Sequence, residues 1–283
     1  MRSNGRTALV TGATSGLGHE LAALLAKAGW TVHVHGRSAG RAAEATARLK
    51  ARLPEADLRA AAGDLGTLAG VWALADALAG EKLDLLVNNA GASFADCALT
   101  ADGIERTVAV NHFAPVLLTR ALADRLAPGA LVLTVSSSSI TYVPVAAEEV
   151  DVRGLFLEAG YTQLRGYALS KLLNLAAMPA LARQTGLAVV MFDPGGIQTD
   201  FAEKGGDAAF VAMTKAHWDA METPAAVAAK AMALIDQAPD LIAGATYHNG
   251  AVIGLSDLAG QPAFQDRILN ETLAVAANAS VAN

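Results

Sequence analysis

Short apolar and β-branched runs alternate along the chain with amphipathic stretches that are rich in alanine and leucine. The runs have the composition of strands, and the stretches between them repeat apolar residues with the period of a helix. Strands are expected at residues 7–11, 31–36, 58–62, 83–88, 130–136, 188–193 and 244–248. Helices are expected at residues 16–28, 38–53, 67–79, 102–127, 167–184 and 224–237, and near 264–276.

This alternation predicts an α/β fold. Strands that alternate with helices form βαβ units, which build a parallel sheet covered by helices on both faces. Residues 131–135 are almost wholly apolar, as expected of a strand that is buried on both sides. No linker rich in proline, serine or glycine divides the sequence, so we expect a single domain over residues 1–283.

The composition excludes several classes of protein. Of the 283 residues, 53% are hydrophobic and 17% are charged, which is typical of a globular chain with a large core. No apolar run reaches the ~18–20 residues of a membrane span, and the first residues lack the apolar core of a signal peptide. We therefore expect a cytoplasmic protein. The net charge of −6 argues against a nucleic acid or an anionic membrane as partner.

Cysteine and histidine usage gives little support to a metal site. Cys97 is the only cysteine, which excludes an intrachain disulfide and a cysteine-based metal site. His33 and His35 alternate on an expected strand and share one face, as two metal ligands would. No carboxylate or third histidine stands nearby in the sequence to complete a ligand set, so we expect no metal.

A glycine-rich turn follows the first expected strand and leads into the first expected helix. Its glycines leave room for a diphosphate close to the backbone, and the N-terminus of the helix presents free N–H groups to it. This context predicts a dinucleotide site formed by Gly12, Thr14, Ser15, Gly16, Leu17 and Gly18.

The end of the second expected strand indicates which dinucleotide binds. An acidic residue there would bind the ribose 2′-hydroxyl of NAD. This chain instead has Arg37 and Ser38, with Arg41 one helical turn later. A guanidinium matches a phosphate in two-point contact, so NADP(H) is the expected cofactor. The alternative is that Arg37 is a solvated surface charge.

Tyr167 and Lys171 stand four residues apart in an expected helix and so share a face. A phenol titrates near pH ~10, and a neighbouring cation lowers its pKa by favouring the phenolate. The pair would therefore make a general acid or base usable at neutral pH. The alternative is a coincidence of two side chains on one helix.

Together these motifs resemble the short-chain dehydrogenase/reductase family. The glycine turn, an Asp-Leu pair, an Asn-Asn-Ala-Gly run, a serine run, the Tyr/Lys pair and a Pro-Gly motif occur in family order over residues 11–199. Residues 102–112, 170–174 and 244–247 are similar to the retinol-dehydrogenase-like branch. The resemblance implies a Rossmann-type doubly wound parallel sheet with helices on both faces. It also implies homodimers or homotetramers that assemble through long helices.

The resemblance also assigns roles to individual residues. Asn111 would interrupt its helix and position a water beside Lys171, although a helix-capping amide is the alternative reading. Ser137 would polarise the substrate oxygen, with Ser138 as the alternative in a run of four serines. Tyr167 and Lys171 would also contact the nicotinamide ribose. The other implied cofactor contacts are Asp64, Leu65, Asn89, Ala90, Gly91, Pro194, Gly195, Ile197 and Thr199.

The substrate side departs from the common family pattern. Residues 140–166 lengthen the gap between Ser137 and Tyr167, and we expect a substrate-side flap there, with a surface excursion as the alternative. A substrate-binding segment is expected at 197–221. Its apolar residues fit a hydrophobic ketone or aldehyde, unless they only cover the core. The wall residues in question are Tyr142, Leu155, Phe156, Phe201, Phe210, Met213, Trp218 and Met221.

The expected function is hydride transfer between NADP(H) and a carbonyl or alcohol, that is, a carbonyl reductase. One alternative is a non-catalytic NADP(H)-binding sensor or scaffold, which the retained Tyr/Lys pair disfavours. An epimerase or dehydratase is disfavoured because few residues follow Thr199 for a substrate domain.

Pro179 lies inside an expected helix and should kink or end it.

Overall fold

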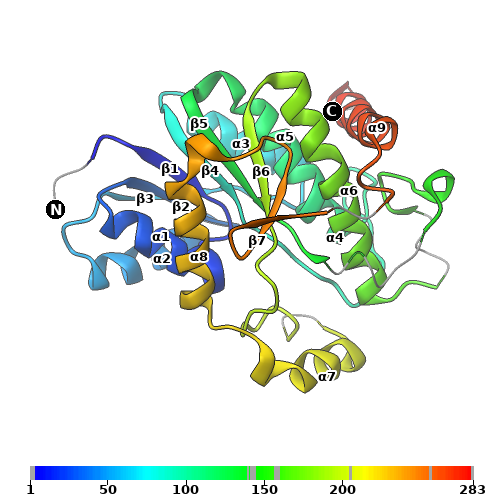
Figure 1. Ribbon diagram of the computed structural model, residues 1–283, viewed down its shortest axis with the longest axis horizontal. Coiled ribbons are helices and arrows are strands. Elements are labelled where there is room, and N and C mark those ends of the chain that lie inside the picture. Colours follow the sequence, from blue (N-terminus) through cyan, green and yellow to red (C-terminus); the bar gives the residue numbers. More distant parts are fainter. Residues whose placement is uncertain are drawn as a thin grey trace.

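The computed structural model describes residues 4–138, 140, 145–155, 160–203, 206–254 and 257–281. Its centre is an eight-stranded sheet with the order β3-β2-β1-β4-β5-β6-β7-β8 (Figure 1). All neighbouring strands are parallel except β7 and β8. The strands are β1 (Thr7–Val10), β2 (Thr31–Gly36), β3 (Leu58–Ala62), β4 (Leu83–Asn88), β5 (Leu126–Val135), β6 (Ala188–Phe192), β7 (Thr246–His248) and β8 (Ala251–Ile253).

Helices cover both faces of the sheet, and each face has its own apolar core. One face carries α1 (Gly16–Lys27), α2 (Ala39–Arg52) and α8 (Pro224–Asp236). The other carries α3 (Leu68–Ala77), α5 (Ala114–Ala121) and α6 (Gln163–Thr185). The strand order reverses between β1 and β4, and sheets of this kind bind ligands outside the carboxyl ends of the strands at such a reversal. The predicted Rossmann-type doubly wound α/β fold is confirmed.

The expected long helix at 102–127 is wrong in its extent. Helical structure begins with α4 (Arg106–Val108), passes through a π-helix (Ala109–Phe113) and continues as α5. Residues before α4 turn instead, because Gly103 has φ +71° and the Glu105 carboxylate caps the helix by accepting from Val108 N at 2.9 Å. The other end is shorter because β5 already begins at Leu126.

Three further features refine the expected elements. Helix α6 does not end at Pro179 but continues to Thr185, since burial of this part of the helix outweighs the lost hydrogen bond. The strand expected last, at 244–248, pairs with a further antiparallel strand, β8. Within the expected substrate segment, residues Ala208–Ala216 form a helix, α7, which projects from the body of the molecule (Figure 1).

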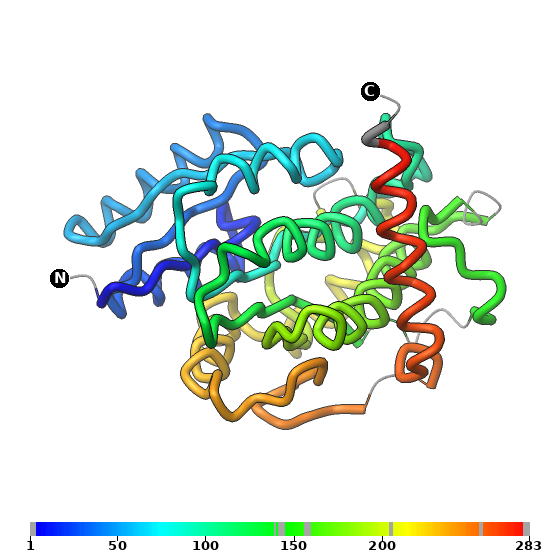
Figure 2. Tube along the Cα trace, turned by 90° about the horizontal axis from the view of Figure 1, so that it is seen from above, coloured from blue at the N-terminus to red at the C-terminus, as the bar shows by residue number. Residues whose placement is uncertain are grey.

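The last helix, α9 (Pro262–Val281), lies across α6 (Figure 2). Arg183 of α6 donates to Asp266 at 2.7 Å, and Arg267 donates to the carbonyl of Ala147 at 2.7 Å. His112 Nε2 and Thr272 Oγ1 are 2.8 Å apart, and Thr272 donates its own proton to a backbone carbonyl. The imidazole is therefore the donor to Thr272. In the part of the chain that is described, no helix is both long and apolar enough to cross a membrane.

We expect His112 to make stability fall in mild acid. Burial lowers its pKa from 6.5 to about 3, so the folded protein keeps the ring neutral while the unfolded chain takes up a proton below pH 6.5. This linkage removes about 2 kcal/mol of unfolding free energy between pH 7 and pH 5. His112→Gln keeps a donor for Thr272 but cannot titrate. Urea unfolding at the two pH values should show a smaller loss in the variant, and an equal loss would contradict the assignment.

Candidate active site

The glycine turn and the end of β4 are locked together at the strand-order reversal. Thr11 Oγ1 accepts from the backbone N–H groups of Asn89 and Ala90 at 2.9 and 3.0 Å. The Asn89 amide donates back to the Thr11 carbonyl at 2.8 Å. Gly12 has φ +65°, and a Cβ on Gly18 would lie 2.3 Å from the Asn89 amide nitrogen. The turn can therefore lie this close to Asn89 only with glycine at 18.

The other predicted cofactor residues line the same edge of the sheet. Gly16, at the first position of α1, has φ +59°, and a Cβ there would lie 3.3 Å from Thr199. The glycine turn therefore faces the Pro-Gly segment that follows β6. In that segment Ile197 forms an isolated parallel bridge with Glu222, which fixes its backbone. A cofactor laid along this edge would lie between the two segments.

The predicted phosphate-recognition residues lie at the end of β2. Arg37 and Ser38 are both exposed, and the Ser38 hydroxyl caps α2 by accepting from Arg41 N at 3.4 Å. Arg48, which the sequence reasoning missed, donates to the carbonyl of Thr14 at 2.6 Å and so ties α2 to the glycine turn. Nothing in the local pattern around Arg48 indicates this contact, because its partner lies 34 residues away.

Tyr167 and Lys171 lie together on α6 as predicted, but the phenol is not activated in the way the sequence predicts. Lys171 Nζ lies 5.7 Å from the centroid of the Tyr167 ring and donates to the Val135 carbonyl at 2.8 Å. Burial raises the pKa of Tyr167 to about 12, while a side-chain hydrogen bond with Ser137 acts to lower it. Burial lowers the pKa of Lys171 to about 8, and the Asp193 carboxylate opposes that shift.

The described serines after β5 differ in their surroundings. Ser136 is buried, and its hydroxyl has no hydrogen-bond partner among the described residues. Ser137 is half-buried and is hydrogen-bonded to Tyr167. Ser138 is exposed. Ser139 lies outside the described residues. The contact with the phenol favours Ser137 over Ser138 as the hydroxyl beside the reacting groups.

Asn111 is buried in the π-helix between α4 and α5, so the helix is interrupted at this residue. Its amide accepts from Ala92 N at 2.7 Å and donates to the Ser170 hydroxyl at 2.9 Å. The Asn111 carbonyl accepts from the amide of Asn174 at 2.6 Å. The π-helix is thus held by two residues of α6, one on each side of Lys171 in the sequence. The sequence did not indicate these roles for Ser170 and Asn174.

The expected substrate-binding segment follows β6. Phe201 meets Tyr167 edge to face, with ring centroids 5.5 Å apart. None of the nine residues of α7 is buried. Buried Gln163, one turn before Tyr167, accepts from Asp207 N at 2.8 Å and donates to the Ser93 carbonyl at 3.1 Å, so it ties the start of α7 to α6. The predicted wall residues Tyr142 and Phe156 lie outside the described residues.

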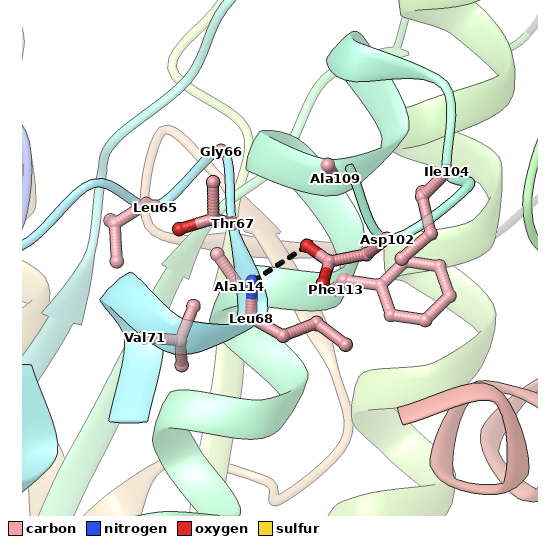
Figure 3. A pocket seen from close by; sticks show the side chains of 10 residues that line it. All are labelled: Leu65, Gly66, Thr67, Leu68, Val71, Asp102, Ile104, Ala109, Phe113 and Ala114. Carbon is pink, nitrogen blue, oxygen red and sulfur yellow. Dashed lines mark hydrogen bonds between the residues drawn. The ribbon is translucent and has the colours of Figure 1, made fainter. Parts of the chain in front are cut away.

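A small hollow beside the start of α3 is a packing joint and not a ligand site. Ten residues line it, most of them apolar (Figure 3). The Asp102 carboxylate accepts from Leu68 N at 3.0 Å across it. It leaves no room for a water-sized molecule. Across the described ranges, no three His, Cys, Asp or Glu side chains gather as metal ligands would.

Comparison with known proteins points to one family. The family model for short chain dehydrogenases matches residues 6–148. "Putative daunorubicin C-13 ketoreductase DnrU" from Streptomyces sp. (strain C5) is 36% identical over 201 residues, covering 69% of this chain and 67% of the relative. Retinol dehydrogenase 14 from Mus musculus is 34% identical over 215 residues, covering 70% of this chain but only 63% of its own length.

Solved structures agree with the fold. The landomycin C-6 ketoreductase LanV, crystallised with NADP and rabelomycin, has a TM-score of 0.64 at 25% identity and covers 88% of this chain and 98% of its own. An uncharacterised protein from Mycobacterium paratuberculosis has a TM-score of 0.70 at 25% identity, with 98% and 96% covered.

We expect Gly18→Ala to destabilise the protein by about 1–3 kcal/mol, the usual cost of overpacking. The added methyl would displace the Asn89 amide from Thr11, because it would lie 2.3 Å from the amide nitrogen. Gly40→Ala in α2 is the matched control, since a Cβ there meets nothing within 4 Å. Urea unfolding should show a lower midpoint for the first variant and an equal or higher midpoint for the second. A midpoint for Gly18→Ala equal to that of Gly40→Ala would refute the close approach of the glycine turn to Asn89.

Proposed function

Because this chain belongs to the short-chain dehydrogenase family, we propose that it is an NADP(H)-dependent oxidoreductase that reduces a hydrophobic ketone or aldehyde. The observation that carries the proposal is the cluster of Ser137, Tyr167 and Lys171 at the end of β5. A sensor or scaffold without chemistry would not need a phenol hydrogen-bonded to a serine hydroxyl, with a buried ammonium 5.7 Å from the centre of its ring.

In this proposal NADPH supplies the hydride, and the protein supplies alignment and the proton. Ser137 and Tyr167 donate hydrogen bonds to the carbonyl oxygen, where negative charge develops as the hydride arrives. Tyr167 then delivers its proton to that oxygen. Asn111 keeps the π-helix beside Ser170, one residue before Lys171, through its 2.9 Å hydrogen bond. It would hold the water that links the ammonium to solvent.

Lys171 would lower the pKa of Tyr167, which must fall before the phenol can act as a proton donor near pH 7. With a pKa of about 8, the lysine is mostly protonated at pH 7, so it is available as a cation. We propose that, with the dinucleotide bound, Lys171 would hold the nicotinamide ribose, and the charge of its ammonium would favour the phenolate of Tyr167.

NADP(H) is the proposed cofactor because the residues at the end of β2 suit a phosphate. Arg37 and Ser38 are exposed beside the N-terminus of α2, where a guanidinium, a hydroxyl and the helix dipole all favour an anion. The glycines at 12, 16 and 18 let the turn lie close to the neighbouring segments, because a Cβ at each would come within 3.4 Å of another protein atom. LanV binds NADP, and another neighbour of similar TM-score, a blue fluorescent protein, binds NADPH.

A bulky hydrophobic carbonyl compound is the proposed substrate. Phe201 covers Tyr167, and the chain that follows carries two exposed apolar side chains, Met213 in α7 and Trp218 just beyond it. The relatives and neighbours include the "Putative daunorubicin C-13 ketoreductase DnrU" and the landomycin C-6 ketoreductase LanV. We also propose that residues 1–283 form one domain, with 140–166 as a substrate-side flap and 197–221 as the substrate-binding segment. A cytoplasmic location and assembly as homodimers or homotetramers stay predictions.

Tyr167→Phe should abolish NADPH oxidation by a ketone or aldehyde that the wild type reduces, because the variant cannot donate the proton. The assay follows the loss of NADPH absorbance with a panel of aromatic and aliphatic carbonyl compounds. NADPH binding, measured by fluorescence titration, should stay within about threefold of wild type. Tyr247→Phe is the control. The Tyr247 hydroxyl lies away from the proposed site, where it accepts a hydrogen bond of 2.8 Å from Ile242 N. Near-normal turnover in Tyr167→Phe would overturn the proposed proton donor.

Arg37→Ala should raise the KM for NADPH by about tenfold or more, the loss of one charge-assisted phosphate contact, and leave the KM for NADH nearly unchanged. Arg52→Ala is the matched control. Arg52 is the last residue of α2, at the end of that helix far from Arg37, and it pairs with Glu20 at 3.1 Å. A parallel change for both cofactors would contradict recognition of the 2′-phosphate by Arg37.

A further inference from the structure

His35 joins two loops that the proposed cofactor would contact. It lies near the end of β2 and is 3% exposed. Its Nδ1 accepts from the backbone N–H of Gly12, in the glycine turn, at 3.1 Å. Its Nε2 lies 2.9 Å from the carbonyl of Gly63, the residue before Asp64 and Leu65. One side chain therefore bridges the segment expected at the diphosphate and the segment expected at the adenine.

The two partners fix the state of the ring. The Gly12 N–H can only donate and the Gly63 carbonyl can only accept, so the proton must be on Nε2 and the ring must be neutral. Burial lowers the pKa of His35, against the opposing effects of the Gly63 carbonyl and the Asp64 carboxylate, and so favours the neutral form. Both ring nitrogens are satisfied by these two loops alone.

The backbone around His35 strengthens the same junction. The His35 carbonyl accepts from Ala13 N at 3.0 Å, and the Gly36 carbonyl accepts from Gly63 N at 3.3 Å. The end of β2 thus holds the glycine turn on one side and the β3–α3 loop on the other. The side-chain bridge adds a fixed spacing between the two loops, because the imidazole is rigid and its two nitrogens are engaged in opposite directions.

We propose that His35 is a positioning residue for the dinucleotide, which sets the separation between the diphosphate-binding turn and the adenine-binding loop. This inference rests on the proposed function. It leaves the hydride and proton transfers untouched, because His35 contacts neither Tyr167 nor Lys171 in any hydrogen bond of the described residues. Its loss should weaken cofactor binding and not slow the chemistry.

His33 offers a matched comparison within the same strand. It is also buried and points to the same side of the sheet two residues earlier, but its Nε2 lies 3.8 Å from Glu81. Glu81 belongs to a charged cluster with Arg59, which donates to it at 2.8 Å. The alternating histidine pair thus divides into one residue that bridges the loops and one that lies beside surface charges.

The test compares four variants by NADPH fluorescence titration and by steady-state kinetics with a carbonyl compound that the wild type reduces. His35→Ala removes both hydrogen bonds and should raise the Kd and KM for NADPH by about tenfold or more. Its kcat at saturating NADPH should stay within about twofold of wild type. His35→Asn keeps an acceptor for Gly12, and His35→Gln keeps a donor for Gly63, so both should bind NADPH with intermediate affinity. His33→Asn should bind like the wild type.

Wild-type affinity in His35→Ala would overturn the inference, as would equal weakening in His33→Asn and His35→Ala. If His35→Ala does not fold, the Asn and Gln variants decide, and wild-type affinity in both would overturn it. A wild-type protein that binds no NADPH would overturn the proposed function itself and the inference with it. If the wild type binds NADPH and the His35 variants bind it with the same affinity, the inference alone is overturned.

Discussion

The site depends on the close approach of the glycine turn to the end of β4. Thr11 and Asn89 exchange two hydrogen bonds, and Ala90 N donates a third to the Thr11 hydroxyl. All three are between 2.8 and 3.0 Å long. These bonds lie at the reversal of strand order, where the chain leaves β1 on one side and β4 on the other. Because only glycine at position 18 leaves space for the Asn89 amide, these side-chain and backbone contacts fix the distance between the glycine turn and the end of β4.

The reacting groups are then held from the other side by α6. Lys171 is anchored to the end of β5 through the Val135 carbonyl, while Asn174 holds the carbonyl of Asn111 in the π-helix. The irregular helix is therefore part of the site and not a defect in α5, since regular α-helical geometry would place the Asn111 amide elsewhere. Burial of the same groups explains the high pKa of Tyr167 and the low pKa of Lys171.

The sequence predicted the sheet well because strands buried on both faces carry continuous apolar runs, as β4 and β5 do. The motif residues of the site were also predictable, since each belongs to a local pattern. The interruption of the helix at Asn111 was expected from the family resemblance, but the local sequence does not indicate its π-helical form. Contacts such as that of Gln163 with Asp207 join residues 44 positions apart, and no local pattern indicates them.

Helix α7 carries a consequence for how such a protein diversifies. None of its residues is buried, and the Asp207 backbone at its start is tied to the body by Gln163. Substitutions along α7 therefore change little of the core on which folding depends. If this helix borders the substrate, as proposed, selection can alter that face while the dinucleotide-binding edge of the sheet and the overall stability are kept. In this architecture the acquisition of a new substrate range is separated from the maintenance of the fold.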